Sequence, residues 1–187
     1  MTPPSSTYVV LGLLAKRSGS GYDVAAFADR SVRFFWPISR SQLYAELARL
    51  EEVGWASGTA VQQRRYPNKR VYEITESGAE ALSEWLDDAP LQQGRTQDAM
   101  VLRTFLGSHM SPDRLAAQLR EHRDQAQRTR EELSAVVGHL DDKAEPTESQ
   151  RFGRASARYG VLQAEATIAW TEEVEALLEA ERAAQSG

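Results

Sequence analysis

The sequence predicts a mainly α-helical protein in two parts, the first of which also contains a β-hairpin. Three observations predict this fold. Residues 7–54 contain three short segments whose apolar residues repeat at helical spacing. Residues 55–75 contain two short segments rich in β-branched and aromatic residues, joined by a Pro-Asn turn. Beyond residue 110, apolar residues keep helical spacing over two much longer segments, which indicates an antiparallel pair of long helices.

The composition is that of a soluble chain with a core. Of the 187 residues, 41% are apolar, and 22 Lys and Arg stand against 27 Asp and Glu, a net charge of −5. The absence of cysteine excludes disulfides and thiolate metal sites. The longest apolar run, Tyr8–Ala15, is shorter than the ~20 residues of a membrane span and lacks the flanks of a signal peptide. We therefore expect a cytoplasmic protein that does not enter a membrane.

The first two helices are predicted from their caps. The first is expected to begin after the hydroxyl cluster Ser5–Thr7 and to end before a turn at Arg17–Gly21. Ser20 is placed to cap the second helix, with Asp23 three residues on in the capping-box position. This helix is expected to end near Val32.

An aromatic connection and a third helix follow. In residues 33–37, Phe34, Phe35 and Trp36 are expected to fill the core rather than form a ligand cage. Ser39 then caps the third helix, with Gln42 in the reciprocal position. The helix carries one apolar stripe and is followed by a glycine beyond its end: Leu43, Leu47, Leu50 and Gly54.

The hairpin and a fourth helix complete the first part. The strands are expected at residues 55–61 and 70–75, and Thr75 is placed to cap a helix from Glu76 to about Leu86. The inward residues of this helix are predicted to be Leu82, Trp85 and Leu86. Three helices followed by a hairpin are the order of a winged helix-turn-helix, which we assign to residues 1–88.

The second part is predicted to consist of a connection and two long helices. Residues 89–110 are expected to form a linker and a short helix, capped by Thr96, that carries Met100, Val101, Phe105 and Leu106. Residues 111–187 are assigned to a helical dimerisation domain that starts at Ser111-Pro112-Asp113, where a cap, a first-turn proline and an acid agree. The predicted seam of its first long helix is Leu115, Leu119, His122, Ala126, Thr129, Leu133, Val136 and Leu140.

The last helix, from about Ser149 to Ala183, carries more apolar surface than one partner helix can cover. Its apolar residues spread over more than one stripe, so we predict that a second subunit covers the remainder. The residues expected in this dimer contact are Phe152, Tyr159, Leu162, Trp170, Val174 and Leu177. For Tyr159 and Trp170, an effector cavity between helices is the alternative.

The third helix has the surface of a DNA recognition helix. With the leucine stripe turned inward, Ser41 and Ala45 face outward, and Gln42 and Arg49 lie on one flank with Tyr44 on the other. Small and hydrogen-bonding side chains let a helix enter the major groove. An ordinary solvated helix face is the simpler interpretation. With the residues that open the helix, the candidate contacts are Ser39, Arg40, Ser41, Gln42, Tyr44, Ala45 and Arg49.

The hairpin turn favours the DNA interpretation. Arg64, Arg65, Lys69 and Arg70 surround Tyr66 without an acid between them, which suits phosphates and a narrow minor groove. A basic hairpin that merely aids solubility is the alternative. If about 4 phosphates are neutralised per subunit, a dimer gives a log–log salt slope of about −7. Tyr22, in the first turn of the second helix, lies where a helix N-terminus either holds a phosphate or is simply capped.

Catalysis, a cofactor and a metal site find no support in the sequence. His109, His122 and His139 lack metal-ligand spacing, and no phosphate loop, nucleophile elbow or zinc-protease motif occurs. We therefore expect a binding protein rather than an enzyme.

Four stretches together resemble the PadR family of transcriptional regulators: LGLLAKRSGSGYDV, SQLYAELARLEEVGW, VYEITESGAEALSEWL and YGVLQAEATIAWTEEVEALL. The arrangement is similar to the subgroup with a long C-terminal helical domain. The resemblance implies a homodimeric repressor on a near-palindromic operator, released by a small molecule such as a phenolic acid. It also places Tyr22, Ser41, Gln42 and Tyr44, and the wing residues Arg64, Arg65 and Lys69, at DNA-contacting positions.

The leading hypothesis is therefore a dimeric, ligand-tunable repressor that binds double-stranded DNA. A winged-helix protein-interaction module with a helical assembly domain and no DNA binding is the alternative.

Overall fold

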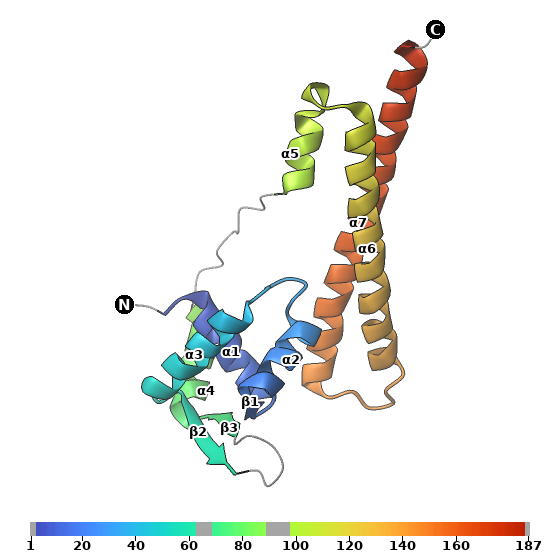
Figure 1. Cartoon of the computed structure of the whole chain (residues 1–187). Coiled ribbons are helices and arrows are strands. Elements are labelled where there is room, and N and C mark those ends of the chain that lie inside the picture. The colour runs from blue at the N-terminus through green and yellow to red at the C-terminus, as the bar shows by residue number, and fades with distance from the viewer. Residues whose placement is uncertain (1–2, 63–68, 89–97, 186–187) are drawn as a thin grey trace. The chain divides into compact units, whose positions relative to one another are not determined.

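The chain forms two compact units, residues 1–93 and 94–187, in the computed structural model shown in Figure 1. The structure describes residues 3–62, 69–88 and 98–185. Each unit has its own hydrophobic core, so each is described by itself. Among the described residues, no helix is both long and apolar enough to cross a membrane.

The first unit contains four helices, α1 (Ser5–Lys16), α2 (Gly21–Ser31), α3 (Arg40–Glu52) and α4 (Glu76–Asp88). All four were predicted, in this order. The leucine stripe of α3 is at most 1% exposed and forms the centre of the core together with α1 and α2. The Tyr8 ring of α1 stacks on Trp85 of α4, with ring centroids 4.8 Å apart. The apolar spacing of the sequence therefore gave the inner face of these helices.

A small antiparallel sheet joins the helices. Its strands are β1 (Gly19–Ser20), β2 (Ala56–Val61) and β3 (Lys69–Ile74), in the spatial order β1-β3-β2. The pair β2 and β3 is the predicted hairpin. The short strand β1 lies where only a turn was expected, because the edge of β3 supplies backbone partners that the local sequence cannot reveal.

In the first unit, local caps agree with the predictions at Ser20, Ser39, Gly54 and Thr75 and differ at the start of α1. Ser20 and Asp23 form the complete capping box at the start of α2. Gly54 has a φ of 76°, the left-handed conformation that ends a helix and favours glycine. The Gly78 N–H donates to the Thr75 hydroxyl at 3.1 Å. The predicted cap of α1 is wrong, because Ser5–Thr7 lie inside the helix and Pro4 is its N-cap.

Two apolar expectations in the first unit are corrected. Phe35 and Trp36 are 49% and 41% exposed, so the connection before α3 does not bury them in the core. Phe34 is half buried and lies under the Arg33 guanidinium, 4.5 Å from its ring centroid. Leu86 is 66% exposed, because it lies in the last turn of α4, beyond the residues that pack on α1.

The second unit is built on two long helices, α6 (Pro112–Asp141) and α7 (Glu148–Gln185), preceded by α5 (Ala99–Phe105) and the 3-10 turn η1 (Gly107–His109). Figure 1 shows α6 and α7 side by side. Their ion pairs follow an antiparallel register from the connecting turn to the far end: Asp141 with Arg154, Arg123 with Glu175, and Asp113 with Arg182.

The seam of this helix pair follows the predicted heptad. Leu115, Leu119, Ala126 and Leu133 are buried, whereas Val136 is 38% exposed. Met100 of α5 is 6% exposed and packs with Leu115 and Leu119, so α5 is part of the helical unit's core. Asp98 caps α5 through the N–H groups of Met100 and Val101. Thr96, the predicted cap, lies outside the described residues, and Asp98 takes that place.

Candidate nucleic-acid interface

The recognition-helix prediction concerns the outward face of α3, and the structure exposes that face. Ser41, Gln42 and Ala45 are exposed, while Leu43 and Leu47 on the other side are buried. The Ser39 hydroxyl accepts from the Gln42 N–H at 3.2 Å and lies 3.1 Å from the Ser41 hydroxyl. The first turn of α3 therefore presents hydroxyl and amide groups on a capped helix end.

Two cationic side chains on α3 are partly engaged by carboxylates. Arg40 lies 3.5 Å from Asp29 of α2, with both side chains about half exposed or more. Arg49 is held at 3.5 Å by Glu46, one turn earlier. Because both arginine side chains are more than half exposed and each meets its carboxylate through one nitrogen, most of their donors remain available to a phosphate.

The start of α2 lies against α3 through a tyrosine. The Tyr44 ring packs on Gly21 so closely that a Cβ at residue 21 would collide with its Cε1 and lie 3.0 Å from its Cδ1. Tyr44 is nevertheless 47% exposed and Tyr22, the next residue of α2, is 65% exposed. Two tyrosines thus project from neighbouring helix ends, as the DNA hypothesis requires.

A residue that the sequence analysis missed lies on the inner side of α3. Glu46 is 5% exposed, and its carboxylate accepts hydrogen bonds from Ser6 at 2.7 Å and Thr7 at 2.8 Å. These hydroxyls belong to the first turn of α1, where the helix dipole also favours a negative charge. Its signal in the sequence is its position: Glu46 is a carboxylate within the apolar stripe between Leu43 and Leu50.

The root of the hairpin is tied to both α2 and α3. Lys69 lies 3.7 Å from Asp23 at the start of α2. The hydroxyl and N–H of Ser20 lower the pKa of Asp23, and the charges of Lys69 and Arg17 act in the same direction. Arg70 forms an ion pair with Glu51 at the end of α3. The other predicted wing residues, Arg64, Arg65 and Tyr66, lie outside the described residues.

The last helix exposes an apolar stripe on the side away from α6. Phe152 is 67% exposed, Tyr159 55%, Leu162 49% and Leu177 56%. Val174 was predicted in the dimer contact, but it is buried within its own chain against α6 and α5. Trp170 is half buried and packs on the same intrachain core.

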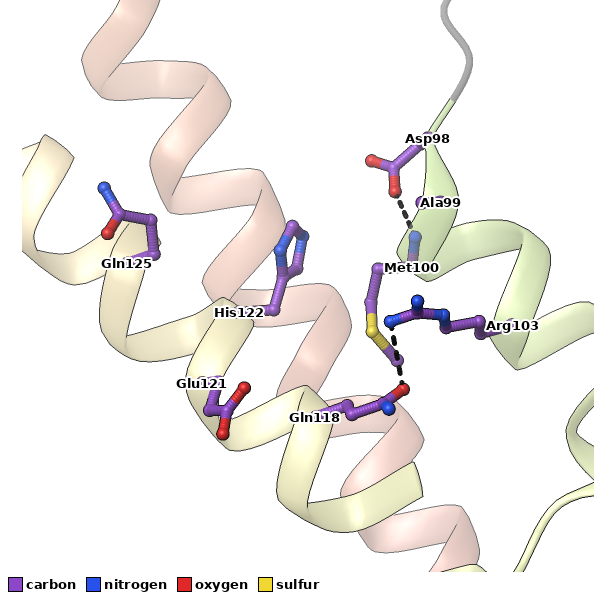
Figure 2. A pocket seen from close by; sticks show the side chains of 8 residues that line it. All are labelled: Asp98, Ala99, Met100, Arg103, Gln118, Glu121, His122 and Gln125. Atoms are coloured by element: carbon purple, nitrogen blue, oxygen red, sulfur yellow. Dashed lines mark hydrogen bonds between the residues drawn. The ribbon is translucent and has the colours of Figure 1, made fainter. Parts of the chain in front are cut away.

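The helical unit also contains an open hollow of about 460 Å³ between α5 and α6. Figure 2 shows Met100 and Arg103 on α5 facing Gln118 and His122 on α6. Arg103 donates to the Gln118 side chain at 3.2 Å, and the His122 ring meets Trp170 of α7 edge-on at 6.4 Å. The hollow is lined by Asp98, Ala99, Met100, Arg103, Gln118, Glu121, His122 and Gln125.

Both halves of the chain match known families. Residues 10–84 match the transcriptional regulator PadR-like family, and residues 96–179 match the C-terminal domain of virulence activator alpha. The chain is 29% identical to the negative transcriptional regulator PadR of Bacillus subtilis over 178 residues, 92% of this chain and 96% of the relative. These matches are to regulators rather than to enzymes.

Solved structures with the same fold cover almost the whole chain. The virulence activator AphA of Vibrio cholerae has a TM-score of 0.74 and 28% identity, covering 94% of this chain and 99% of that one. Bacillus subtilis PadR in complex with operator DNA has a TM-score of 0.79 and 23% identity, with the same coverage. The same protein in complex with p-coumaric acid has a TM-score of 0.71, 23% identity and coverage of 96% and 99%. The predicted fold, a winged helix-turn-helix with C-terminal long helices, is confirmed.

Proposed function

We propose that this chain, which belongs to the PadR-like family of transcriptional regulators, is a homodimeric repressor of near-palindromic operator DNA. The observation that carries the proposal is the capped N-terminal half of α3, whose small and hydrogen-bonding side chains are exposed on a helix that is otherwise buried by leucines. Such a helix end is the part that enters a major groove and meets base edges. We also propose that the protein acts in the cytoplasm.

The proposed DNA contacts fall into two groups. We assign Ser41, Gln42 and Ala45 to contacts with bases, and the cap, tyrosine and basic residues around them to contacts with phosphates. The second group consists of Tyr22, Ser39, Arg40, Tyr44, Arg49, Arg64, Arg65, Tyr66 and Lys69. Two-fold symmetry doubles these contacts on one duplex, and screening beyond a Debye length of about 8 Å limits the opposing effect of the net charge of −5 per chain.

The proposed dimer uses the exposed stripe of α7. Phe152, Tyr159, Leu162 and Leu177 are all about half exposed or more, and covering them removes apolar surface from water. We assign residues 1–88 to DNA binding and residues 111–187 to dimerisation, with α5 as an addition to the helical domain.

The proposed effector is a small aromatic or phenolic acid. The reason is the similarity to Bacillus subtilis PadR, a regulator whose structure is known in complex with p-coumaric acid. In this chain, the hollow between α5 and α6 offers an Arg103 guanidinium and the His122 ring to such a molecule. The test is whether p-coumaric acid dissociates the full-length protein from its operator.

The DNA-binding proposal is tested by selecting bound sequences from a random duplex pool and measuring affinity at several salt concentrations. We expect a near-palindromic site and a log–log salt slope of about −7 for the dimer. A protein that binds no duplex at low salt, or binds it without salt dependence, favours the protein-interaction module instead.

The wing is tested by the double variant Arg64→Ala, Arg65→Ala. Because phosphate contacts are independent of sequence, we expect weaker binding to operator and random DNA alike, and a slope reduced by about 0.9 per lost contact. An unchanged slope excludes both arginines from the interface.

A further inference from the structure

Arg70 differs from Lys69 and Arg49 because two of its nitrogens bond the same carboxylate within the chain. Its Nε donates to Glu51 Oε2 at 3.0 Å, and its Nη2 donates to the other oxygen of the same carboxylate. By contrast, Lys69 and Arg49 each meet a carboxylate through a single nitrogen, at 3.7 and 3.5 Å. A two-point contact between a planar guanidinium and a carboxylate fixes direction as well as distance.

The contact joins the two elements that are proposed to meet DNA. Glu51 lies in the last turn of α3, the recognition helix, and Arg70 is the second residue of β3, at the root of the wing. Arg70 pairs with Ala60 of β2 across the sheet. Because side chains alternate along a strand, Arg70 shares a face of β3 with Tyr72, which packs on the core beneath α3.

A glycine keeps the path between the two residues open. Gly58 of β2 lies under the ion pair, and a Cβ there would collide with Arg70 Nε and lie 2.7 Å from Glu51 Oε1. The hydrogen bond from Arg70 is the largest of the effects that lower the pKa of Glu51, followed by the charge of Arg70 and the Gly58 N–H, and together they outweigh desolvation. Glu51 therefore stays ionised and paired at neutral pH.

We propose that Arg70 is a positioning residue rather than a DNA contact: with Glu51 and Gly58 it forms a brace that holds the wing root at a fixed angle to the recognition helix. The inference rests on the proposed DNA-binding function and assigns Arg70 a different role from the DNA contact predicted from the sequence. With the brace in place, α3 and the wing engage one duplex together, without paying the cost of ordering one relative to the other on binding.

The brace and simple electrostatics predict opposite changes in operator affinity when the charge of Glu51 is removed. Glu51 is a negative charge beside the proposed interface, so its removal should tighten binding to any DNA if charge alone matters. If Glu51 acts through the brace, Glu51→Gln should weaken operator binding several-fold and leave random DNA unchanged or bound more tightly. Glu52→Gln is the matched control, because Glu52 is exposed, adjacent and equally charged. We expect it to leave operator binding unchanged or slightly tighter.

Arg70 itself is tested in the full-length protein by its salt slope. Arg70→Lys keeps the charge but removes the planar fork, and we expect it to lose operator affinity with an unchanged slope. Arg70→Ala should do the same, and the double variant Glu51→Gln, Arg70→Ala should be no weaker than either single variant, because both remove one interaction. In the dimer, a lost phosphate contact in each subunit lowers the slope by about 1.8 in total, and a fall of that size in Arg70→Ala overturns the proposal.

The outcomes separate the brace from the function on which it rests. If the wild-type protein binds no DNA, the proposed function fails. If the wild type binds an operator and Glu51→Gln behaves like Glu52→Gln, the function stands and the brace alone is refuted. Thermal unfolding of each variant identifies any loss of operator affinity that comes from misfolding. If the other variants misfold, the operator affinity of Arg70→Lys, the mildest change, tests the brace.

Discussion

At the residue scale, the most consequential residues are those that join α3 to the neighbouring helices. Glu46, a buried carboxylate held by two hydroxyls, joins α3 to the first turn of α1. Gly21 leaves space for the Tyr44 ring, so that α3 and α2 approach closely. Both residues therefore help to fix the position of the proposed recognition helix.

Glu46→Ala should lower stability. The change leaves the buried hydroxyls of Ser6 and Thr7 without their acceptor, which costs about 1–3 kcal/mol per unsatisfied group. Urea unfolding measures the effect. Glu52→Ala, which removes an exposed carboxylate from the same helix, is the control and should change stability by less than about 0.5 kcal/mol. Equal losses would show that Glu46 contributes no more than a surface acid.

Gly21→Ala should displace Tyr44. Residue 21 is the first of α2, and an added Cβ collides with the tyrosine ring there. We expect weaker operator binding with little loss of stability, because the exposed ring can move aside. The double variant Gly21→Ala, Tyr44→Ala removes the clash and should bind no more weakly than Tyr44→Ala alone. A further loss in the double variant would mean that the clash is not the cause.

At the element scale, the surface of α3 differs between its two sides and also between its two ends. Leucines fill one side, and the other side changes from uncharged polar groups at its start to Glu51 and Glu52 at its end. The start is therefore the part suited to a groove, while the end is held by the root of β3. Lys69 and Arg70, at the start of β3, contact α2 and α3, so the described root of the hairpin is joined to both helices.

Gln42→Ala tests whether the first turn of α3 reads bases. An amide that bonds a base edge contributes to sequence discrimination, at about 1–3 kcal/mol for a bidentate pair. We therefore expect a loss of operator affinity that random DNA does not share, measured by parallel titrations. Losses of equal size on both DNAs would assign Gln42 to the backbone.

At the scale of the whole molecule, the acidic net charge and the exposed apolar stripe of α7 point to one solution. In the proposed dimer, the stripe is covered and the basic contacts are repeated along one duplex. Because charges beyond a Debye length of about 8 Å are screened, these local contacts act despite the acidic net charge. The residues of the stripe lie on α7 opposite those that pack on α6, such as Val161 and Ile168.

Tyr159→Glu and Leu177→Glu should each shift the protein towards monomer, because a charge would be placed in an apolar contact. Ala176→Glu is the control, since Ala176 is exposed beside Leu177 but points to another side of the helix. Sedimentation velocity measures the distribution. Dimers of unchanged stability in both stripe variants would remove this face from the interface.

The sequence alone determined the helices and hairpin of this protein, their inner faces and most of their ends. Ser20 with Asp23, the leucines of α3 and the left-handed Gly54 act over a few residues, and local spacing reveals them. The candidate recognition surface of α3 was inferred from its leucine stripe, because the outer face of a helix is fixed once its inner face is known.

The tertiary structure alone decided what joins those elements. Glu46 meets hydroxyls forty residues away in the chain, Arg70 meets Glu51 across nineteen, and β1 exists only because β3 lies beside it. Phe35 and Trp36 remained exposed although their chemistry suits a core. Such contacts depend on how elements pack, which local spacing does not encode. For that reason the pairing of Arg70 with Glu51, on which the proposed brace rests, was not visible in the sequence.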